Sequence, residues 1–145
     1  MPNSLPETAR SLPIAIVRAR EGVMAPVRDM LSATGLTEQQ WRVLRVLSEC
    51  GPMDSTSLAD RASLLFPSLT RIGTTLNKSG LVTQTRDSTD RRKQIVAITP
   101  AGQQIIDRHA DQAALIIESY KARLGDRNYE TLLDLLALLD PGRPG

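Results

Sequence analysis

Residues 81–102 read LVTQTRDSTDRRKQIVAITPAG, and they combine two strand-like runs, a charged turn and a helix start. The β-branched runs 81–86 and 93–99 flank the turn, which predicts a two-stranded hairpin. Thr99 and Pro100 are the residue types favoured at the N-cap and the first position of a helix. The stretch therefore predicts a hairpin that leads directly into a helix.

Two helices separated by a short turn are predicted immediately before this hairpin. The first covers residues 53–62, with Asp54 or Ser55 as its N-cap. The second covers residues 66–79 and ends at Gly80, because glycine accepts the left-handed conformation that often follows a helix. Two short helices, a tight turn and a hairpin predict a winged helix-turn-helix. The charged turn would be the tip of the wing, and the second helix would enter a DNA groove.

The helix predicted over residues 66–79 has two chemically different faces. Apolar residues recur on one face at helical spacing, as a buried stripe requires. They are Leu69, Ile72, Gly73 and Leu76. The other face is rich in hydroxyls and also carries two cations, and hydroxyls suit phosphate oxygens while arginine suits guanine. The candidate DNA contacts on this face are Ser68, Thr70, Arg71 and Thr74. The alternative is an ordinary solvated helix face.

The turn between the two strands carries an excess of positive charge. From Arg86 to Lys93 there are four cations and two anions, which gives a local net charge of +2. The whole chain of 145 residues has a formal net charge of only +2, so this turn exceeds its share. A mildly basic balance does not by itself indicate a nucleic-acid partner. The alternative for the turn is a solvated charged loop.

Further helices are predicted on both sides of this module. A helical pattern covers residues 13–31, where Pro26 removes a backbone donor. The next helix covers residues 38–49 and opens with the capping-box pair Thr37 and Gln40. These two helices precede the predicted winged region.

Two more helices are predicted after the hairpin, over residues 100–124 and 126–140, with a break at Gly125. The last helix is apolar around most of its circumference. Its leucines are Leu132, Leu133, Leu135, Leu136, Leu138 and Leu139. A helix that is apolar on several faces must be buried, and in a chain this small the expected cover is another subunit.

The fold class predicted from these patterns is mostly α with a small β-hairpin. Residues 36–99 are expected to form a winged helix-turn-helix DNA-binding region. Residues 1–35 and 100–145 are expected to form a helical dimerisation region. The length suits one folded unit of this kind.

The residue inventory excludes several functional classes. Cys50 is the only cysteine and His109 the only histidine, so neither an intramolecular disulfide nor a Cys/His zinc site can form within one chain. No HExxH, phosphate-loop or GxSxG motif is present, so we expect neither an enzyme nor a cofactor. No apolar run reaches the roughly 18 residues of a membrane span, and the N-terminus lacks a signal region. We therefore expect a reduced, cytoplasmic compartment and no membrane partner.

The wing and the residues after it resemble a known signature. Asp90, Arg92, Ile98, Thr99 and Gly102 match the pattern of the multiple-antibiotic-resistance regulator (MarR) family. The resemblance covers residues 12 to 139. The segment LTEQQWRVLRVL, which starts at residue 36, is similar to the homoprotocatechuate-degradation repressor branch of that family.

The resemblance implies a homodimer that binds a palindromic operator in double-stranded DNA. It also implies a repressor that is released by a small phenolic or aromatic acid, in keeping with aromatic compound catabolism. In the family, the arginine that matches Arg92 reaches a minor groove, where narrow tracts concentrate negative potential. Asp90 is expected to hold this arginine by an ion pair and so to orient the wing. Arg91 adds charge beside it and is a second candidate for that role.

The residues that would bind an aromatic acid are harder to assign. A carboxylate at the edge of an apolar pocket is expected to pair with an arginine. Arg18, Trp41 and Arg45 are the effector candidates. The alternatives are a core position for Trp41 and surface positions for Arg18 and Arg45.

Two other functions remain open. A winged helix can serve as a protein–protein adaptor that never contacts DNA. That function favours an apolar outer face on residues 66–79, whereas the observed face is polar. A redox-responsive regulator acting through Cys50 is the other alternative. In the peroxide-responding branch of the family that the chain resembles, the reactive cysteine lies near the N-terminus beside tyrosines. Cys50 lies instead beside Gly51 and Pro52, with no tyrosine next to it in the sequence.

Overall fold

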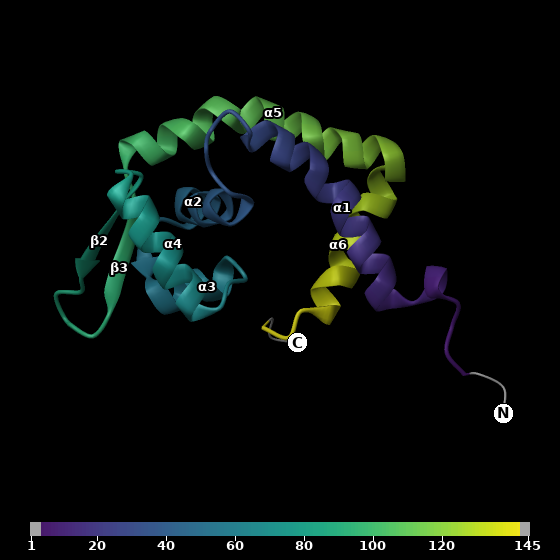
Figure 1. Ribbon diagram of the computed structural model, residues 1–145, viewed down its shortest axis with the longest axis horizontal. Coiled ribbons are helices and arrows are strands. Elements are labelled where there is room, and N and C mark those ends of the chain that lie inside the picture. Colours follow the sequence, from purple (N-terminus) through teal and green to yellow (C-terminus); the bar gives the residue numbers. More distant parts are fainter. Residues whose placement is uncertain (1–3, 143–145) are drawn as a thin grey trace.

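The computed structural model describes residues 4–142, so residues 1–3 and 143–145 of the two expected dimerisation segments lie outside it. The long helix α5 (Pro100–Leu124) spans the molecule (Figure 1). A winged module lies beneath one end of α5, and α1 (Leu12–Leu31) and α6 (Asp126–Leu139) lie toward the other. A short 3-10 turn, Thr8–Arg10, precedes α1. The predicted fold class, mostly α with a small sheet, is confirmed.

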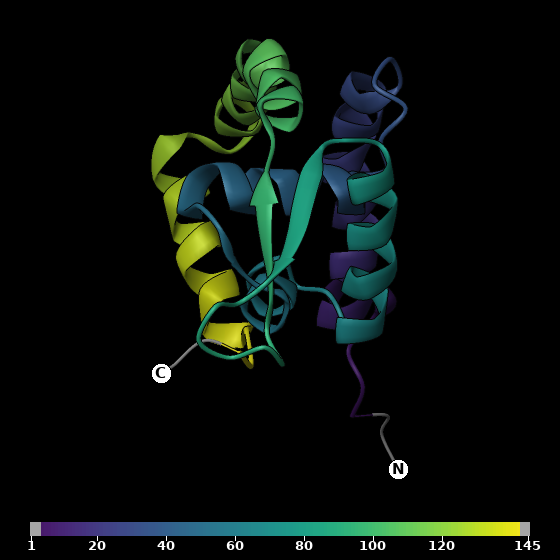
Figure 2. The same ribbon diagram turned by 90° about the vertical axis from the view of Figure 1, so that its left-hand side faces the viewer.

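The winged module consists of α2 (Glu38–Cys50), α3 (Ser55–Arg61), α4 (Phe66–Lys78) and a small antiparallel sheet. The sheet has the order β1-β3-β2. The hairpin of β2 (Val82–Arg86) and β3 (Gln94–Ile98) was predicted, and its register pairs Val82 with Ile98. The third strand, β1 (Met53–Asp54), was not predicted, because two residues are too short to show strand periodicity. α4 lies beside the hairpin (Figure 2).

Most of the buried core lies inside the winged module, and Met30 and Leu31 of α1 and Ile106 and Ile116 of α5 complete it. Its largest fully buried side chains come from three helices and two strands, and they are Leu44, Leu47, Leu58, Leu69, Leu76, Val43, Val82 and Val96. Each such side chain stabilises the fold by roughly 1.5–3 kcal/mol relative to exposure. The predicted inner stripe of α4 is confirmed, since Leu69, Ile72, Gly73 and Leu76 are all buried. This packing fixes which face of α4 points outward.

Polar caps define where the helices of this module begin. The capping box of α2 is formed, with the Gln40 N–H donating to Thr37 Oγ1 at 3.1 Å and the Thr37 N–H donating to Gln40 Oε1 at 2.9 Å. For α3, the sequence left Asp54 and Ser55 open, and the structure shows that Asp54 is the N-cap. Its carboxylate accepts the N–H and the hydroxyl of Ser57, both at 2.9 Å, and these bonds hold the Asp54 pKa below its usual range.

Thr99 joins the winged module to α5. Its side-chain oxygen accepts the Gly102 N–H at 3.2 Å, which confirms the predicted cap. The same hydroxyl donates to the Gly80 carbonyl at 2.7 Å, and the Thr99 N–H donates to the Leu81 carbonyl at 3.0 Å. Gly102 is needed here because a Cβ would stand 2.4 Å from the Leu81 oxygen. The end of β3, the start of β2 and the start of α5 are thus held together.

The outer helices are much less buried than the winged module. α1 runs through Pro26 without ending, and its buried residues are Met30 and Leu31. α6 contains no buried residue. Its six leucines, at positions 132, 133, 135, 136, 138 and 139, are 40–81% exposed in the single chain. An apolar surface of this extent needs a cover that one chain does not supply.

We expect Gly102→Ala to destabilise the protein and Gly73→Ala to be tolerated, although both glycines lie in helices. A Cβ at Gly102 would crowd the Leu81 backbone, whereas a Cβ at Gly73 would meet the movable end of the Gln84 side chain, Nε2, at 2.9 Å. Overpacking costs about 1–3 kcal/mol. Alanine is favoured over glycine within a helix by about 1 kcal/mol, and this gain is common to both variants.

Urea unfolding followed by circular dichroism, at one fixed protein concentration, measures this difference. The midpoint of Gly102→Ala should lie below that of the wild type, and that of Gly73→Ala at or above it. Equal midpoints for the two variants would contradict the tight contact at Leu81.

Candidate nucleic-acid interface and ligand cavity

The outer face of α4 presents its polar side chains to solvent. Thr70, Arg71 and Thr74 are exposed and Ser68 is half-buried. The Thr70 hydroxyl donates to the Phe66 carbonyl and the Thr74 hydroxyl to the Thr70 carbonyl, both at 3.0 Å. These bonds use the hydroxyl protons, so the threonines present methyl groups and acceptor lone pairs outward. A threonine that donates to a phosphate must first release its helical carbonyl.

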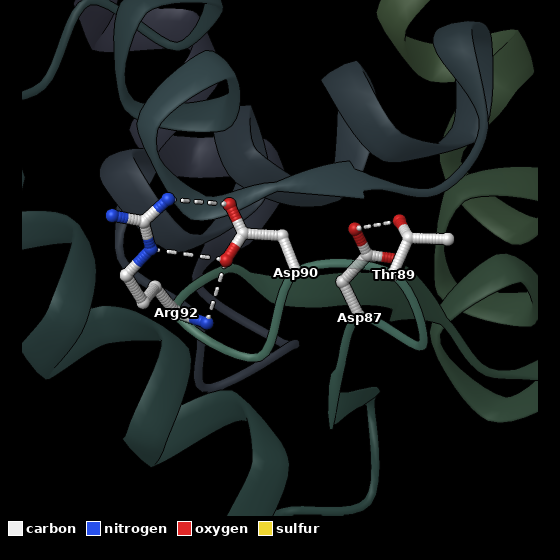
Figure 3. Close-up of polar contacts among 4 residues, drawn as sticks. All are labelled: Asp87, Thr89, Asp90 and Arg92. Atoms are coloured by element: carbon white, nitrogen blue, oxygen red, sulfur yellow. Dashed lines mark hydrogen bonds and ion pairs between the residues drawn. The ribbon is translucent and has the colours of Figure 1, made fainter.

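The tip of the wing is held by Asp90. Its Oδ1 accepts both Arg92 Nε and the Arg92 backbone N–H at 3.1 Å, and its Oδ2 accepts Arg92 Nη2 at 3.4 Å (Figure 3). The expected ion pair is therefore present. These bonds hold the pKa of Asp90 below its usual range, the side chain of Arg92 contributing most. The Arg92 side chain is nevertheless 91% exposed, so its remaining N–H groups are free to bind a partner.

Backbone hydrogen bonds close the same turn. The Asp87 N–H donates to the Lys93 carbonyl and the Lys93 N–H donates to the Asp90 carbonyl, each at 3.0 Å. The Thr89 hydroxyl donates to the Asp87 carboxylate at 3.1 Å (Figure 3). The charged tip of the wing therefore has a defined conformation before any partner binds.

A groove of about 320 Å³ lies between the wing and the helices. Its lining comes from the start of α3, the start of α4 and both strands of the hairpin. The lining residues are Asp54, Ser55, Thr56, Phe66, Thr70, Arg86, Arg92, Lys93 and Gln94. Of the predicted DNA contacts, Thr70 and Arg92 meet in this groove. Ser68, Arg71, Thr74 and Arg91 lie outside its lining.

The sequence prediction did not include Phe66 or the cations Arg86 and Lys93 among the site residues. Phe66 is the first residue of α4 and precedes Thr70 by four positions, so both lie on one side of the helix. That spacing was visible in the sequence. An aromatic residue at a helix start is more often part of a core, however, and nothing local indicated that this one is exposed.

A cavity of about 350 Å³ lies between α1, α2 and α5. Its lining is mostly apolar, and the residues are Val27, Met30, Trp41, Arg45, Ile106, Ala110, Ala113, Ala114, Ile116, Ile117 and Tyr120. The volume falls within the roughly 300–1,000 Å³ of small-molecule sites. Arg45 supplies a cation and Tyr120 a phenol. Such a cavity suits an aromatic molecule that carries an anionic group.

Two of the three effector candidates line this cavity and the third does not. Trp41 and Arg45 both line the cavity, Trp41 as a buried side chain and Arg45 as an exposed one. Arg18 is exposed on α1 and is outside the cavity lining. Tyr120 of α5 also lines the cavity and packs against the core. Its hydroxyl donates to the Val23 carbonyl of α1 at 2.6 Å, and burial raises its pKa.

The single histidine and cysteine occupy ordinary positions. The His109 ring meets Trp41 edge to face, with 6.1 Å between ring centroids, and its Nδ1 lies 2.9 Å from the Ile105 carbonyl oxygen. Cys50 is exposed, and its Sγ lies 3.8 Å from Nη1 of Arg61. Among residues 4–142, no three His, Cys, Asp or Glu side chains gather as a metal site. No helix in that range is long and apolar enough to cross a membrane.

Comparisons with known proteins agree with this geometry. A sequence model of the MarR family matches residues 36–93, inside the region expected to bind DNA. The chain is 38% identical over 130 residues to the homoprotocatechuate degradative operon repressor of Escherichia coli, which covers 90% of this chain and 86% of that protein.

Two solved structures are similar in fold and in sequence. NadR in complex with 4-hydroxyphenylacetate superposes with a TM-score of 0.82 at 34% identity, covering 96% of this chain and 97% of NadR. The transcriptional repressor CouR, bound to a 23-mer DNA duplex, superposes with a TM-score of 0.83 at 26% identity. That match covers 96% of this chain and 99% of CouR.

The carboxyl group of Asp90 should titrate below its ordinary pKa of 3.8. Because the pKa is lowered in the folded protein, the stabilising contribution of the ionised carboxylate is present above about pH 3.8 and is lost as the pH falls through the lowered pKa. Arg92→Gln should raise the Asp90 pKa toward its ordinary value, since the guanidinium is the largest cause of the shift. A carboxyl-detected NMR titration measures this pKa.

Arg91→Gln is the matched control, because it removes the neighbouring positive charge and leaves the ion pair intact. It should change the Asp90 pKa less than Arg92→Gln does. If the two variants shift it equally, the wing is not held by the specific pair of Asp90 and Arg92.

Proposed function

The chain belongs to the MarR family of DNA-binding transcriptional regulators, and from that membership we propose that it is a homodimeric repressor released from its operator by a small aromatic acid. The observation that carries the proposal is that α5 lines the apolar cavity and begins beside Thr99, whose hydrogen bonds join α5 to the winged module. A molecule bound in the cavity therefore contacts the helix that positions the DNA-binding elements.

We propose that α4 enters the major groove and that the wing enters an adjacent minor groove. The contacts on α4 would be Ser68, Thr70, Arg71 and Thr74, and those on the wing Arg91 and Arg92. Support comes from the exposure of the outer face of α4 and from the guanidinium that Asp90 holds outward. Arginine suits the narrow minor groove because the negative potential is concentrated there.

The second copy needed for a palindromic operator would bind through the helices outside the winged module. We propose residues 36–99 as the DNA-binding region and residues 1–35 and 100–145 as the dimerisation region. The exposed leucines of α6 support this division, as do the exposed Ile16 and Val17 of α1 and Leu115 of α5. A two-fold axis between the copies would present two α4 helices to successive major grooves. We also propose a cytoplasmic location, because the protein must reach the DNA that it regulates.

The proposed effector is an aromatic acid of the hydroxyphenylacetate type. Arg45 would pair with its carboxylate, and Trp41 would pack against its ring. Support comes from the size and apolar lining of the cavity and from the relatives, one a repressor of a homoprotocatechuate operon and one solved with 4-hydroxyphenylacetate. An effector that favours the non-binding state by about 2–3 kcal/mol weakens DNA binding roughly 30- to 150-fold.

Arg92→Ala should weaken binding to DNA from upstream of the protein's own gene and should reduce its salt dependence. Each lost phosphate contact lowers the slope of log affinity against log salt by about 0.9, so two wings in a dimer give a decrease of about two. Fluorescence anisotropy at several salt concentrations measures both quantities. Arg108→Ala, which removes an exposed cation on α5, is the control. An unchanged slope in Arg92→Ala would refute the wing contact.

Arg45→Met should weaken the binding of the effector. It should leave DNA binding unchanged when no effector is present. A charge-assisted hydrogen bond contributes about 1.5–3 kcal/mol, so the concentration of 4-hydroxyphenylacetate that releases half of the DNA should rise roughly 10- to 150-fold. Arg18→Met removes the same charge from a residue outside the cavity lining and should leave that concentration unchanged. If Arg18→Met raises that concentration and Arg45→Met does not, Arg18 and not Arg45 pairs with the carboxylate.

A further inference from the structure

An exposed aromatic ring lies on the cationic side of the winged module. Within residues 36–99, the exposed large apolar side chains are Leu65 and Phe66, at 78% and 51% exposure. Both lie where α3 turns into α4. Most other side chains of this kind lie on α1, α5 and α6, where the second copy is proposed to bind. The proposed dimer interface therefore does not explain why an apolar side chain is exposed at the start of α4.

The surroundings of Phe66 suit a polyanion. Its ring lines the groove together with Arg86, Arg92 and Lys93 of the hairpin, and with Thr70 one turn further along α4. The acid of this groove, Asp54, is already occupied as the cap of α3. The groove therefore presents an apolar ring among cations, which matches an apolar group carried on a strongly anionic molecule.

Duplex DNA carries one such group. In the major groove, the C5-methyl of thymine is the apolar group among the base edges, and the other edges present hydrogen-bond donors and acceptors. A phenyl ring cannot pair with those donors and acceptors, and contact with it would leave them without a partner. The N-terminal residues of a helix in the major groove contact base edges, and Phe66 is the first residue of α4.

We propose that Phe66 is a specificity-determining residue that packs on the C5-methyl group of a thymine in each operator half-site. This inference rests on the proposed binding of α4 in the major groove. It adds an aromatic, base-selective contact to the predicted contacts of α4 and the wing, whose side chains are otherwise those of serine, threonine and arginine. Because Phe66 carries no charge, its contact contributes to base preference and leaves the salt dependence unchanged.

The test compares one operator duplex made with thymine and the same duplex made with uracil, which lacks the methyl group but keeps the hydrogen-bonding edge. The operator is selected from random duplexes with the full-length wild-type protein. Burial of one methyl-sized group contributes about four-fold in affinity, so two half-sites predict roughly 15-fold weaker binding of the uracil duplex. Phe66→Ala should bind the thymine duplex that much more weakly and should distinguish the two duplexes little. Phe66→Leu should keep part of the preference.

The matched control is Leu65→Ala, since Leu65 is a still more exposed neighbour outside the groove lining. Its thymine-to-uracil ratio should equal that of the wild type. The comparison between variants cancels any difference in shape between the two duplexes, because both are the same for every protein. Unchanged urea midpoints and salt slopes would show that Phe66→Ala is folded and still makes its ionic contacts.

Each outcome separates the inference from the function on which it rests. Wild-type protein that binds both duplexes equally, or a preference that survives in Phe66→Ala, overturns the role of Phe66 and leaves the DNA-binding function intact. Loss of the preference in Leu65→Ala but not in Phe66→Ala moves the contact to Leu65. Failure of the wild type to select any sequence at low salt overturns the proposed function and the inference together.

Discussion

The geometry of the whole chain depends on the joint at Thr99. One hydroxyl caps α5 through the Gly102 N–H and also holds the Gly80 carbonyl at the end of the α4 turn. The backbone N–H of the same residue bonds to Leu81, whose carbonyl lies so close to Gly102 that no side chain fits there. These contacts leave little freedom between α4, the hairpin and α5. A displacement of α5 must therefore carry the wing and α4 with it.

This coupling gives α5 two functions in one helix. Its first residues belong to the joint, and its later residues line the cavity together with Trp41 and Arg45 of α2. Toward the far end of the cavity lining, Tyr120 is bonded to the Val23 carbonyl, three residues before Pro26 in α1. The position of α5 is thus set by polar contacts at both ends and by an apolar, partly open space between them. A ligand in that space would contact α5 between these two sets of polar contacts.

Apolar residues are mostly buried in the winged module and mostly exposed on the outer helices. The winged module buries most of its leucines and valines, and apart from Leu65 and Phe66 it presents a mainly polar surface with a cationic wing to solvent. The outer helices keep their apolar residues exposed, because a single chain offers nothing to cover them. The wing, with its tip closed by Asp90 and by backbone hydrogen bonds, is already organised in the single chain. Binding then does not require the wing to be ordered first, which removes part of the entropic cost of association.

Local sequence patterns were sufficient for the helices, the hairpin, the capping box at Thr37 and the cap at Thr99. Each of these depends on residues that are close together in the chain, so spacing alone specifies it. The pair of Asp90 and Arg92 was expected from the resemblance to the MarR family. The strand β1, the partner of Tyr120, the choice of Arg45 over Arg18 as a cavity residue and the exposure of Phe66 could not be predicted in that way. They depend on segments that are distant in sequence, such as Tyr120 and Val23, which are 97 residues apart. Only the packing of the folded chain decides which of these side chains meet.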